Sequence, residues 1–473
     1  MKKDFIVTKE ESFLKSALSS EQSMMNENDI VEWLKGQNNK INVNIKKIPF
    51  SKLFLWEYDE ANGTIRHQTG KFFSVDGIRV RTNWGSLHEW DQPVLNQPEI
   101  GFLGFITKEF NGILHFLVQA KIEPGNINYV QISPTLQATR SNFTMMHRGK
   151  KPLYLDYFQN VRTENTLLDQ LQSEQGARFL KKRNRNIIIK IEDDIPVYDN
   201  FKWLTLSQLK SLTAHSNLVN MDTRTVISGI TYGSLDRIGS GFPGLDPSNI
   251  KTSFLKSAMI SQGALNDLDD IITFLTKMKS NYDLDLEKVP LKNLNDWSYS
   301  GNEISHRENK YFKVIAVEVE IDNREVINWS QPMIEPAQNG LCAFVCKEIN
   351  GLIHFAVQAK LECGNFDIIE FAPTVQCLTG NYRDTKEGTL PFLDYILNVN
   401  KEKIFYDALQ SEEGGRFYRE QNRNLIVVAG DEVSVQLPQG YIWMTLNQLF
   451  VFLKFNNYLN IQARSLISAI SFI

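Results

Sequence analysis

The strongest constraint in this chain of 473 residues is an internal duplication. Residues 118–126 read VQAKIEPGN and residues 357–365 read VQAKLECGN, and the block 112–137 is identical to the block 351–376 at 13 of 26 positions. Other paired segments are SFLKSAL with SFLKSAM, WDQP with WSQP, QSEQGARF with QSEEGGRF, and WLTLSQL with WMTLNQL, at offsets between 238 and 241 residues. A period near 240 is far too long for a solenoid. We therefore expect two tandem folded domains that pack as a pseudo-symmetric pair.

The boundary between the two copies is visible in the composition. Residues 231–252 concentrate Gly, Ser, Pro and Asp between a helical pattern that ends the first copy and one that begins the second, as is typical of linkers. The expected organisation is a first domain over residues 1–234, a linker over 235–252 and a second domain over 253–473.

Hydrophobic periodicity predicts a mixed α+β fold for each copy. In the first copy the helical spacing covers residues 10–35, 163–182 and 205–228, whereas strand-like runs cover 64–81, 101–108, 112–122 and 127–137. Asn-Gly stands at 111–112 and again at 350–351, and this dipeptide between two alternating runs is a strong hairpin signal. Each domain should be a mixed or antiparallel sheet flanked by helices.

Composition removes several classes of function. The net charge is −4, so the sequence predicts neither a basic nucleic-acid groove nor a polybasic membrane patch. The N-terminus does not resemble a signal peptide and no run of about 18 apolar residues occurs, so a cytoplasmic location is expected. The four cysteines all lie in the second copy and are interpreted as reduced thiols. Dinucleotide-binding, P-loop and nucleophile-elbow motifs are absent from the sequence, and the histidines form no metal-binding pattern.

The repeated strand has one polar side. Because side chains alternate along a strand, His115, Gln119, Lys121 and Glu123 share one side, and His354, Gln358, Lys360 and Glu362 repeat the arrangement in the second copy. The sequence leaves two interpretations open. The polar side is either a functional face or an ordinary solvated surface.

Further candidates for binding an anionic ligand follow these strands. The segment TRSNFTMMHRGKK at 139–151 offers hydroxyl, amide and guanidinium donors suited to phosphate oxygens, and TGNYRDTK at 379–386 is its counterpart. The arginines of RFLKKRNRN and RFYREQNRN are further candidates, or they complement a helix dipole. Trp56 and Trp297 occupy matching positions where they could stack on a base, or belong to the core.

Several segments taken together resemble a known family. VQAKIEPGN, SPTLQATRSN, LDYF, SEQGARF and RNRN, in this order and repeated in weaker form across nearly the whole chain, are similar to the NDP-hexose 2,3-dehydratases of deoxysugar biosynthesis. The resemblance implies two tandem Nudix-like modules, usually in a homodimer, that act on a nucleotide-linked 4-keto-6-deoxyhexose without a metal or redox cofactor. The glutamate-rich Nudix box that binds magnesium is absent, which disfavours pyrophosphate hydrolysis.

The chemistry that the resemblance implies gives the polar strand a role. A ketone at carbon 4 acidifies the proton on carbon 3, so elimination of the hydroxyl on carbon 2 needs a base, an enolate stabiliser and an acid. The candidate catalytic residues are Lys121 and Glu123, or Lys360 and Glu362, with His115 or His354 nearby. The candidate substrate-binding residues are Trp56, Thr139, Arg140, Ser141, Asn142, Phe143, Trp297, Tyr382, Arg383, Arg416, Asn422 and Arg423.

Three matters stay open at this point. The second copy reads TGNY where the first reads RSNF, so the two modules need not bind ligand in the same way. A nucleotide-sugar binding protein without catalysis and a divergent Nudix-type pyrophosphatase are the alternative functions. The sequence does not fix the sugar's stereochemistry or the nucleotide base, for which the family commonly uses thymidine.

Overall fold

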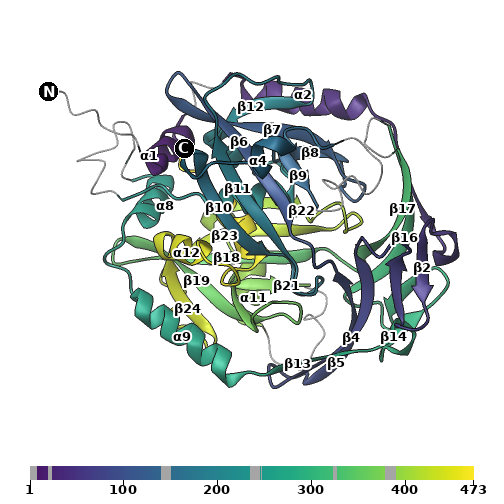
Figure 1. The fold of residues 1–473 in the computed structure, drawn as a ribbon. Coiled ribbons are helices and arrows are strands. Elements are labelled where there is room, and N and C mark those ends of the chain that lie inside the picture. Colours follow the sequence, from purple (N-terminus) through teal and green to yellow (C-terminus); the bar gives the residue numbers. More distant parts are fainter. Residues whose placement is uncertain are drawn as a thin grey trace.

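The computed structural model describes residues 8–19, 24–139, 151–234, 246, 248–322, 327–378 and 390–473. It is a mixed α+β protein in which each sequence repeat builds a seven-stranded sheet, and two five-stranded sheets lie beside them on the right of Figure 1. We use the terms first repeat and second repeat for the chain before and after the segment 235–247.

The large sheet of the first repeat is mixed. Its central order is β10-β11-β6-β7-β12, in which β11 and β6 run parallel and the other neighbours antiparallel, with β8 beside β7 and β9 beside β6. The bounds are β6 (Gly101–Phe110), β7 (Ile113–Ile122), β8 (Val130–Ser133), β9 (Leu136–Ala138), β10 (Thr166–Ser173), β11 (Arg183–Lys190) and β12 (Phe201–Thr205). The helices of this repeat are α1 (Lys9–Ala17), α2 (Glu27–Asn39), α4 (Leu155–Gln159), α5 (Leu206–Leu212) and α6 (Met221–Ser228).

The large sheet of the second repeat has the same topology, with β22-β23-β18-β19 in place of β10-β11-β6-β7. Its strands are β18 (Gly340–Ile349), β19 (Leu352–Leu361), β20 (Ile369–Ala372), β21 (Val375–Cys377), β22 (Ile404–Ser411), β23 (Gln421–Ala429) and β24 (Tyr441–Thr445). Its helices are α8 (Ile250–Met259), α9 (Leu268–Asn281), α11 (Leu393–Leu397), α12 (Leu446–Leu453) and α13 (Ile461–Ser468).

The two small sheets exchange strands between the repeats. Strand β1 of the first repeat pairs antiparallel with β16 of the second, and β13 of the second pairs antiparallel with β4 of the first. One sheet holds β1 (Val43–Ile48), β14 (Trp297–Tyr299), β15 (Glu303–His306), β16 (Phe312–Ile321) and β17 (Asn328–Pro336). The other holds β2 (Trp56–Asp59), β3 (Thr64–His67), β4 (Ser74–Thr82), β5 (Glu89–Asn96) and β13 (Leu284–Lys288). The structure therefore differs from the prediction of two self-contained domains, because each repeat supplies an edge strand to the other.

Local sequence accounts for many element boundaries. Thr8, Thr205 and Thr445 cap α1, α5 and α12 with capping boxes, in which the threonine hydroxyl accepts from the third helical N–H. The predicted hairpin between β6 and β7 is confirmed: Asn111 and Gly112 have φ angles of 52° and 76°, as a type I′ turn requires.

The expected helix over residues 163–182 is wrong. Residues 166–173 form β10, which pairs antiparallel with β11 from Asp169 opposite Ile187 to Ser173 opposite Arg183. Apolar side chains at 167, 168 and 171 have a spacing that also fits a helix, but the hydrogen bonds to a strand ten residues later decide the conformation. The predicted helix over 10–35 is two helices, α1 and α2.

The two repeats share one interior. The largest buried apolar cluster contains residues of both, from Phe13 to Phe472, and α6 of the first repeat contacts α13 of the second. The fully buried guanidinium of Arg464 on α13 donates to Thr225 Oγ1 at 2.9 Å and to the carbonyl oxygen of Ser173. Arg224 on α6 makes the reciprocal bonds to Ser465 and Ser411. These crossed arginines lie where the repeats meet.

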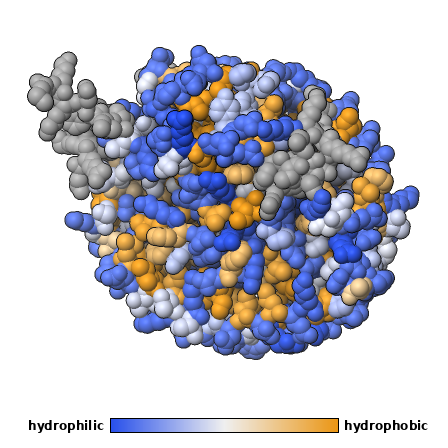
Figure 2. All heavy atoms as spheres, viewed as in Figure 1, coloured by the Kyte–Doolittle hydropathy of each residue, from blue (hydrophilic) through white to orange (hydrophobic). Residues whose placement is uncertain are grey.

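On the face shown in Figure 2, apolar side chains form separate patches between polar ones. In the described part of the chain, no helix combines the length and apolar character that crossing a membrane would require.

Candidate active site

The polar end of each repeated strand leads into the opposite repeat. After β7, the backbone N–H of Gly125 donates to the carbonyl oxygen of Gly414 at 2.7 Å, and the N–H of Arg419 donates to the carbonyl oxygen of Gly125 at 2.7 Å. After β19, Gly364 makes the same two bonds with Gly176 and Lys181. The segments EPGN and ECGN are thus each bound by the glycine-containing loop of the other repeat.

Glu123 is held by a chain of amides. Its carboxylate accepts a hydrogen bond from Gln137 Nε2 at 2.6 Å, and Gln137 Oε1 accepts from Asn220 Nδ2 at 3.2 Å and from Ser133 Oγ at 2.9 Å. The ammonium of Lys121 lies 3.4 Å from the backbone carbonyl oxygen of Gln137. Asn220 is also the N-cap of α6, so the start of this helix fixes the orientation of the network. Lys121 and Glu123, which the sequence predicts to share one strand face, both lie against Gln137.

The second repeat reproduces the network. Gln376 Nε2 donates to Glu362 at 2.8 Å, Asn460 Nδ2 donates to Gln376 Oε1 at 2.7 Å, and Lys360 lies 3.5 Å from the Gln376 carbonyl oxygen. Burial raises the pKa of Glu362. We call the surroundings of Glu123 the first site and the surroundings of Glu362 the second site.

Both sites draw side chains from both repeats. A Cβ added at Gly415 would lie 2.4 Å from a Glu413 carboxylate oxygen and 3.7 Å from a Glu123 carboxylate oxygen, which places these two carboxyl groups side by side. Arg416 follows in the same loop, where its guanidinium stacks 4.2 Å from the ring centroid of Phe73. Burial raises the pKa of Glu413, and the charge of Arg416 opposes this rise. Arg178 has the matching position over Phe312 at the second site. Arg416, a predicted binding residue, thus lies at the first site.

The two sites differ in their acids, and sequence reasoning missed these residues. Asp222, buried in the first turn of α6, corresponds to Gln462 on α13, and Glu413 corresponds to Gln175. Burial raises the pKa of Asp222 well above its usual range, and the carboxylates of Glu123 and Glu413 raise it further. The difference between SEQG and SEEG was visible in the aligned copies, but only the fold shows that this position faces the other repeat's glutamate.

The two predicted histidines lie elsewhere, which corrects their proposed catalytic role. His115 and His354 are buried at the start of β7 and β19, six residues and roughly 20 Å along the strand from Lys121 and Lys360. His354 Nδ1 donates to the Leu352 carbonyl oxygen at 2.9 Å while its Nε2 accepts from the Leu265 N–H at 3.0 Å. Burial lowers the pKa of both rings, so they serve as neutral structural groups.

The two predicted base-stacking tryptophans belong to the core. Trp56 and Trp297 are 8% and 6% exposed, and their indole N–H groups donate to the backbone carbonyls of Ser330 at 2.9 Å and Asp91 at 2.7 Å. Trp56 packs against Phe73, on whose ring Arg416 stacks. Trp56 therefore supports a site arginine through Phe73, and it also lines a cavity of about 430 Å³ together with Phe50 and Tyr299.

The remaining predicted binding residues divide into three groups. Asn422 donates to Glu412 and accepts from the Gly340 N–H, and Arg423 forms a bidentate ion pair with Asp407 at 2.9 and 2.6 Å, so both make structural contacts. Thr139 is half-buried directly after β9, two residues beyond Gln137. The predictions for Arg140, Ser141, Asn142, Phe143, Tyr382 and Arg383 fall outside the described residues.

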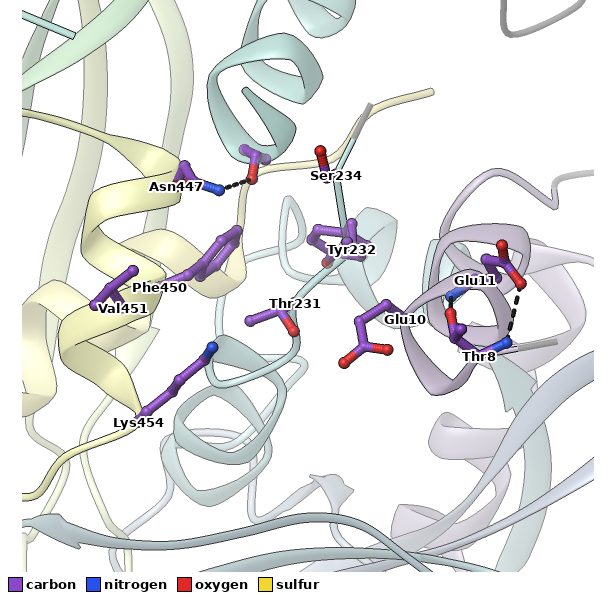
Figure 3. Close-up of a pocket in the computed structure, with 12 residues that line it drawn as sticks. Thr8, Glu10, Glu11, Thr231, Tyr232, Ser234, Asn447, Phe450, Val451 and Lys454 are labelled. Atoms are coloured by element: carbon purple, nitrogen blue, oxygen red, sulfur yellow. Dashed lines mark hydrogen bonds between the residues drawn. The ribbon is translucent and has the colours of Figure 1, made fainter. Parts of the chain in front are cut away.

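A separate cavity of about 300 Å³ lies between α1, α12 and the segment 231–234 (Figure 3). Glu10, Tyr232 and Lys454 are among its lining residues, and none of the candidate residues lines it. Across the part of the chain that the structure describes, His, Cys, Asp and Glu side chains form no cluster suited to a metal ion.

Comparison with known proteins extends over both repeats. The model of the NDP-hexose 2,3-dehydratase family matches residues 27–230 and again residues 268–470. A protein of Saccharopolyspora spinosa named dTDP-4-dehydro-6-deoxy-alpha-D-glucopyranose 2,3-dehydratase is 41% identical over 460 residues, 97% of this chain and 94% of its own length. Proteins of the same name are 37% identical in Amycolatopsis orientalis (96% and 92% covered) and 40% identical in Streptomyces violaceoruber (90% and 93% covered).

Proposed function

Because the chain belongs to the NDP-hexose 2,3-dehydratase family, we propose that it removes water across carbons 2 and 3 of a dTDP-linked 4-keto-6-deoxyhexose. The reaction would give a 3,4-diketo-2,6-dideoxy sugar that stays on its nucleotide. The bond is broken by elimination, with neither hydrolysis nor net oxidation, so the enzyme would be a lyase. The names of three relatives that cover nearly the whole chain support the substrate.

The observation that carries the proposal is the juxtaposition of a lysine and several carboxyl groups at the first site. Removal of the carbon 3 proton creates an enolate whose charge rests on the carbon 4 oxygen, and a preorganised cation stabilises that charge. We assign the base to Glu123, which Gln137 orients, and the enolate stabiliser to Lys121. The substrate's own ketone accepts the electrons in this scheme.

Arg416 is our candidate for the diphosphate. Its guanidinium donates to the Gly415 carbonyl oxygen at 2.8 Å, and its Nε is buried without a hydrogen-bond partner among the described residues. A buried, unpaired N–H costs free energy unless a ligand accepts from it. Arg178 has an equally unpaired Nε at the second site, so Lys360, Glu362 and Arg178 form the alternative set.

Three further properties accompany the proposal. We infer Nudix-like modules, supported by the mixed seven-stranded sheet with one central parallel pair in each repeat. We infer a homodimer, supported by the exposed apolar side chains of Leu153, Tyr157, Val197 and Tyr198 on the first repeat; the molar mass in solution would test it. We infer a cytoplasmic location, supported by four cysteines that are all unpaired.

The test is to incubate the protein with dTDP-4-keto-6-deoxyglucose without added metal or cofactor, reduce the products promptly and measure the mass of the nucleotide sugar. The expected result is loss of one water, with kcat about 10²–10⁴-fold lower for Glu123→Gln. Loss of activity in Glu362→Gln alone would move the working site to the second repeat. An unchanged mass with a raised melting temperature would favour a binding protein. Release of a nucleoside monophosphate with magnesium would favour a pyrophosphatase.

A further inference from the structure

We propose that Glu413, which the second repeat contributes to the first site, is the general acid that protonates the departing hydroxyl on carbon 2. The inference rests on the proposed dehydration and adds a catalytic residue to it. Both repeats then contribute catalytic residues to the first site, because the first repeat supplies the base and the second repeat supplies the acid.

The position of Glu413 suits this role. Its carboxyl group lies beside that of Glu123, because both approach the vacant Cβ position of Gly415. Glu413 is half-buried, and its carboxyl group accepts no hydrogen bond from any residue that the structure describes. By contrast, the neighbouring Glu412 is buried and bonded to Asn422 and Gln175. Glu413 is therefore the glutamate of this loop that has room to reach a ligand.

The surroundings of Glu413 keep it protonated. Burial raises the pKa of Glu413 to about 8, with Arg416 opposing and the carboxylates of Glu123 and Glu174 adding to the rise. Asp222 lies in the same cluster, and its interaction with Glu413 disfavours a second negative charge. Two acids that share a site take up different protonation states. An elimination needs a base and a protonated acid, and Glu413 supplies the protonated group beside Glu123, the assigned base.

The second site lacks counterparts of the acids Glu413 and Asp222, although its amide network is the same; its own buried acid, Glu370, lies near Glu362 and accepts a hydrogen bond from Ser173 Oγ at 2.8 Å. Gln175 stands where Glu413 stands, and its amide donates to Glu412. Gln462 stands where Asp222 stands, and its Oε1 is buried without a partner in the described chain. An amide, which cannot act as a general acid, occupies both positions, and Gln175 has the same shape as a glutamate. The two sites therefore share the same amide network but differ in the acids at these two positions.

The elimination moves one proton from the sugar to Glu123 and one from Glu413 to the departing hydroxyl. Glu123 takes the proton from carbon 3, and the C–H electron pair forms the enolate between carbons 3 and 4. As the carbon 4 ketone re-forms, a double bond arises between carbons 2 and 3 and the C2–O bond breaks. The Glu413 proton passes to the leaving oxygen, which departs as water and leaves the Glu413 carboxylate. Tautomerisation of the enol then gives the diketone, and Glu123 releases its proton to solvent while Glu413 takes one up, which restores both groups.

The decisive variant is Glu413→Gln, which places at the first site the residue that the second site already holds in a folded chain. We expect kcat on dTDP-4-keto-6-deoxyglucose to fall about 10²–10⁴-fold with little change in KM. The alkaline limb of the kcat–pH profile, which reports loss of the acid's proton, should disappear. A 2-deoxy-2-fluoro analogue of this substrate needs less help from an acid because fluoride leaves as an anion, so its elimination should fall much less.

Glu303→Gln is the control, since Glu303 is a half-buried glutamate that binds Lys313 in a small sheet; its kcat and pH profile should match the unaltered enzyme. If Glu413→Gln keeps its kcat and its alkaline limb, Glu413 is not the acid. Equal losses on the hydroxyl and fluoro substrates would also overturn the assignment. If the unaltered enzyme releases no water, the proposed function fails instead, so the two failures are distinguishable.

Discussion

The backbone N–H of Gly125 donates to the carbonyl oxygen of Gly414 across the repeat interface at 2.7 Å, and Gly364 repeats the bond to Gly176. The two bonds place the end of each polar strand, with Glu123 or Glu362, inside a loop of the opposite repeat. Each site is therefore built from both copies. After duplication the two sites could change separately: Asp222 and Glu413 lie near Glu123, whereas the residues at the corresponding positions of the second site are Gln462 and Gln175.

Alanine at Gly125 should weaken this interface. An added Cβ would lie 1.7 Å from the Phe417 carbonyl oxygen, a backbone atom that cannot move aside without breaking the loop contact. We expect Gly125→Ala to lower the free energy of unfolding by roughly 1–3 kcal/mol, as measured by urea denaturation. Gly364→Ala, with the same 1.7 Å approach to the Phe179 carbonyl oxygen, should cost a similar amount.

Gly36→Ala is the matched control for those variants. Gly36 lies inside α2 with no atom near its Cβ position, so alanine should stabilise the chain by about 0.5–1 kcal/mol. Equal effects of the substitution at Gly36 and Gly125 would contradict the close contact at the interface.

Removal of one crossed arginine should be costly. Arg464→Met leaves the Ser173 and Leu459 carbonyls without their donor and removes the positive charge near the buried Glu370. We expect a loss of roughly 3–5 kcal/mol in the free energy of unfolding. Arg423→Met, which breaks a half-exposed ion pair with Asp407, should cost about 1 kcal/mol or less. Similar losses for both would mean that burial of the arginine does not matter.

Strand exchange predicts that the repeats do not fold well alone. Without the second repeat, β4 loses its partner β13 and β1 loses its partner β16, which leaves open edges that invite aggregation. Residues 1–234 expressed alone should be aggregated or poorly folded. Co-expression with residues 246–473 should restore a complex that elutes as one species. A monomeric, cooperatively unfolding first repeat would refute this expectation.

The buried Lys210 should make the free energy of unfolding increase with pH. Its buried ammonium donates to the carbonyls of Ser468 and Ile470 at 3.1 and 3.0 Å, and burial lowers its pKa to about 7. Between pH 7 and the unfolded pKa of roughly 10.4, the unfolded chain binds more protons, so the free energy of unfolding increases with pH. Lys210→Met should be more stable than the unaltered protein at pH 7, and this advantage should shrink towards pH 10 by at most about 1.4 kcal/mol per pH unit. A constant difference would mean that Lys210 stays charged in the fold.

Glu413 should make the free energy of unfolding decrease as the pH rises. Its folded pKa of about 8 lies above the usual value, so the folded chain binds more protons than the unfolded chain between about pH 4.5 and 8. Stability from this group is present at low pH and is lost as the pH rises through 8. The melting temperature of Glu413→Gln relative to the unaltered protein should therefore increase from pH 5 to pH 8.5 and then level off. A difference that does not vary with pH would show that Glu413 titrates normally.

Local patterns in the sequence were informative where one element decides its own structure. The Asn-Gly hairpin at 111–112 and the polar side of β7 followed from turn chemistry and alternation. The expectations for Trp56, Trp297, His115 and His354 failed because side-chain type does not reveal what packs around it. A tryptophan on a strand suits a core as well as a binding surface, and only the contacts with Phe73 and Ser330 distinguish the two for Trp56.

The sequence by itself determined that the protein is a duplication, that each copy carries a lysine and a glutamate on one strand face, and that the chain resembles a dehydratase family. The tertiary structure alone decided that the copies exchange β1 and β13 and that Glu413 of the second repeat lies beside Glu123 of the first. The physical reason is the distance along the chain over which each kind of interaction acts. Periodicity and turn residues act over a few neighbours, whereas these contacts join backbone and carboxyl groups hundreds of residues apart, and their geometry exists only once both repeats are packed.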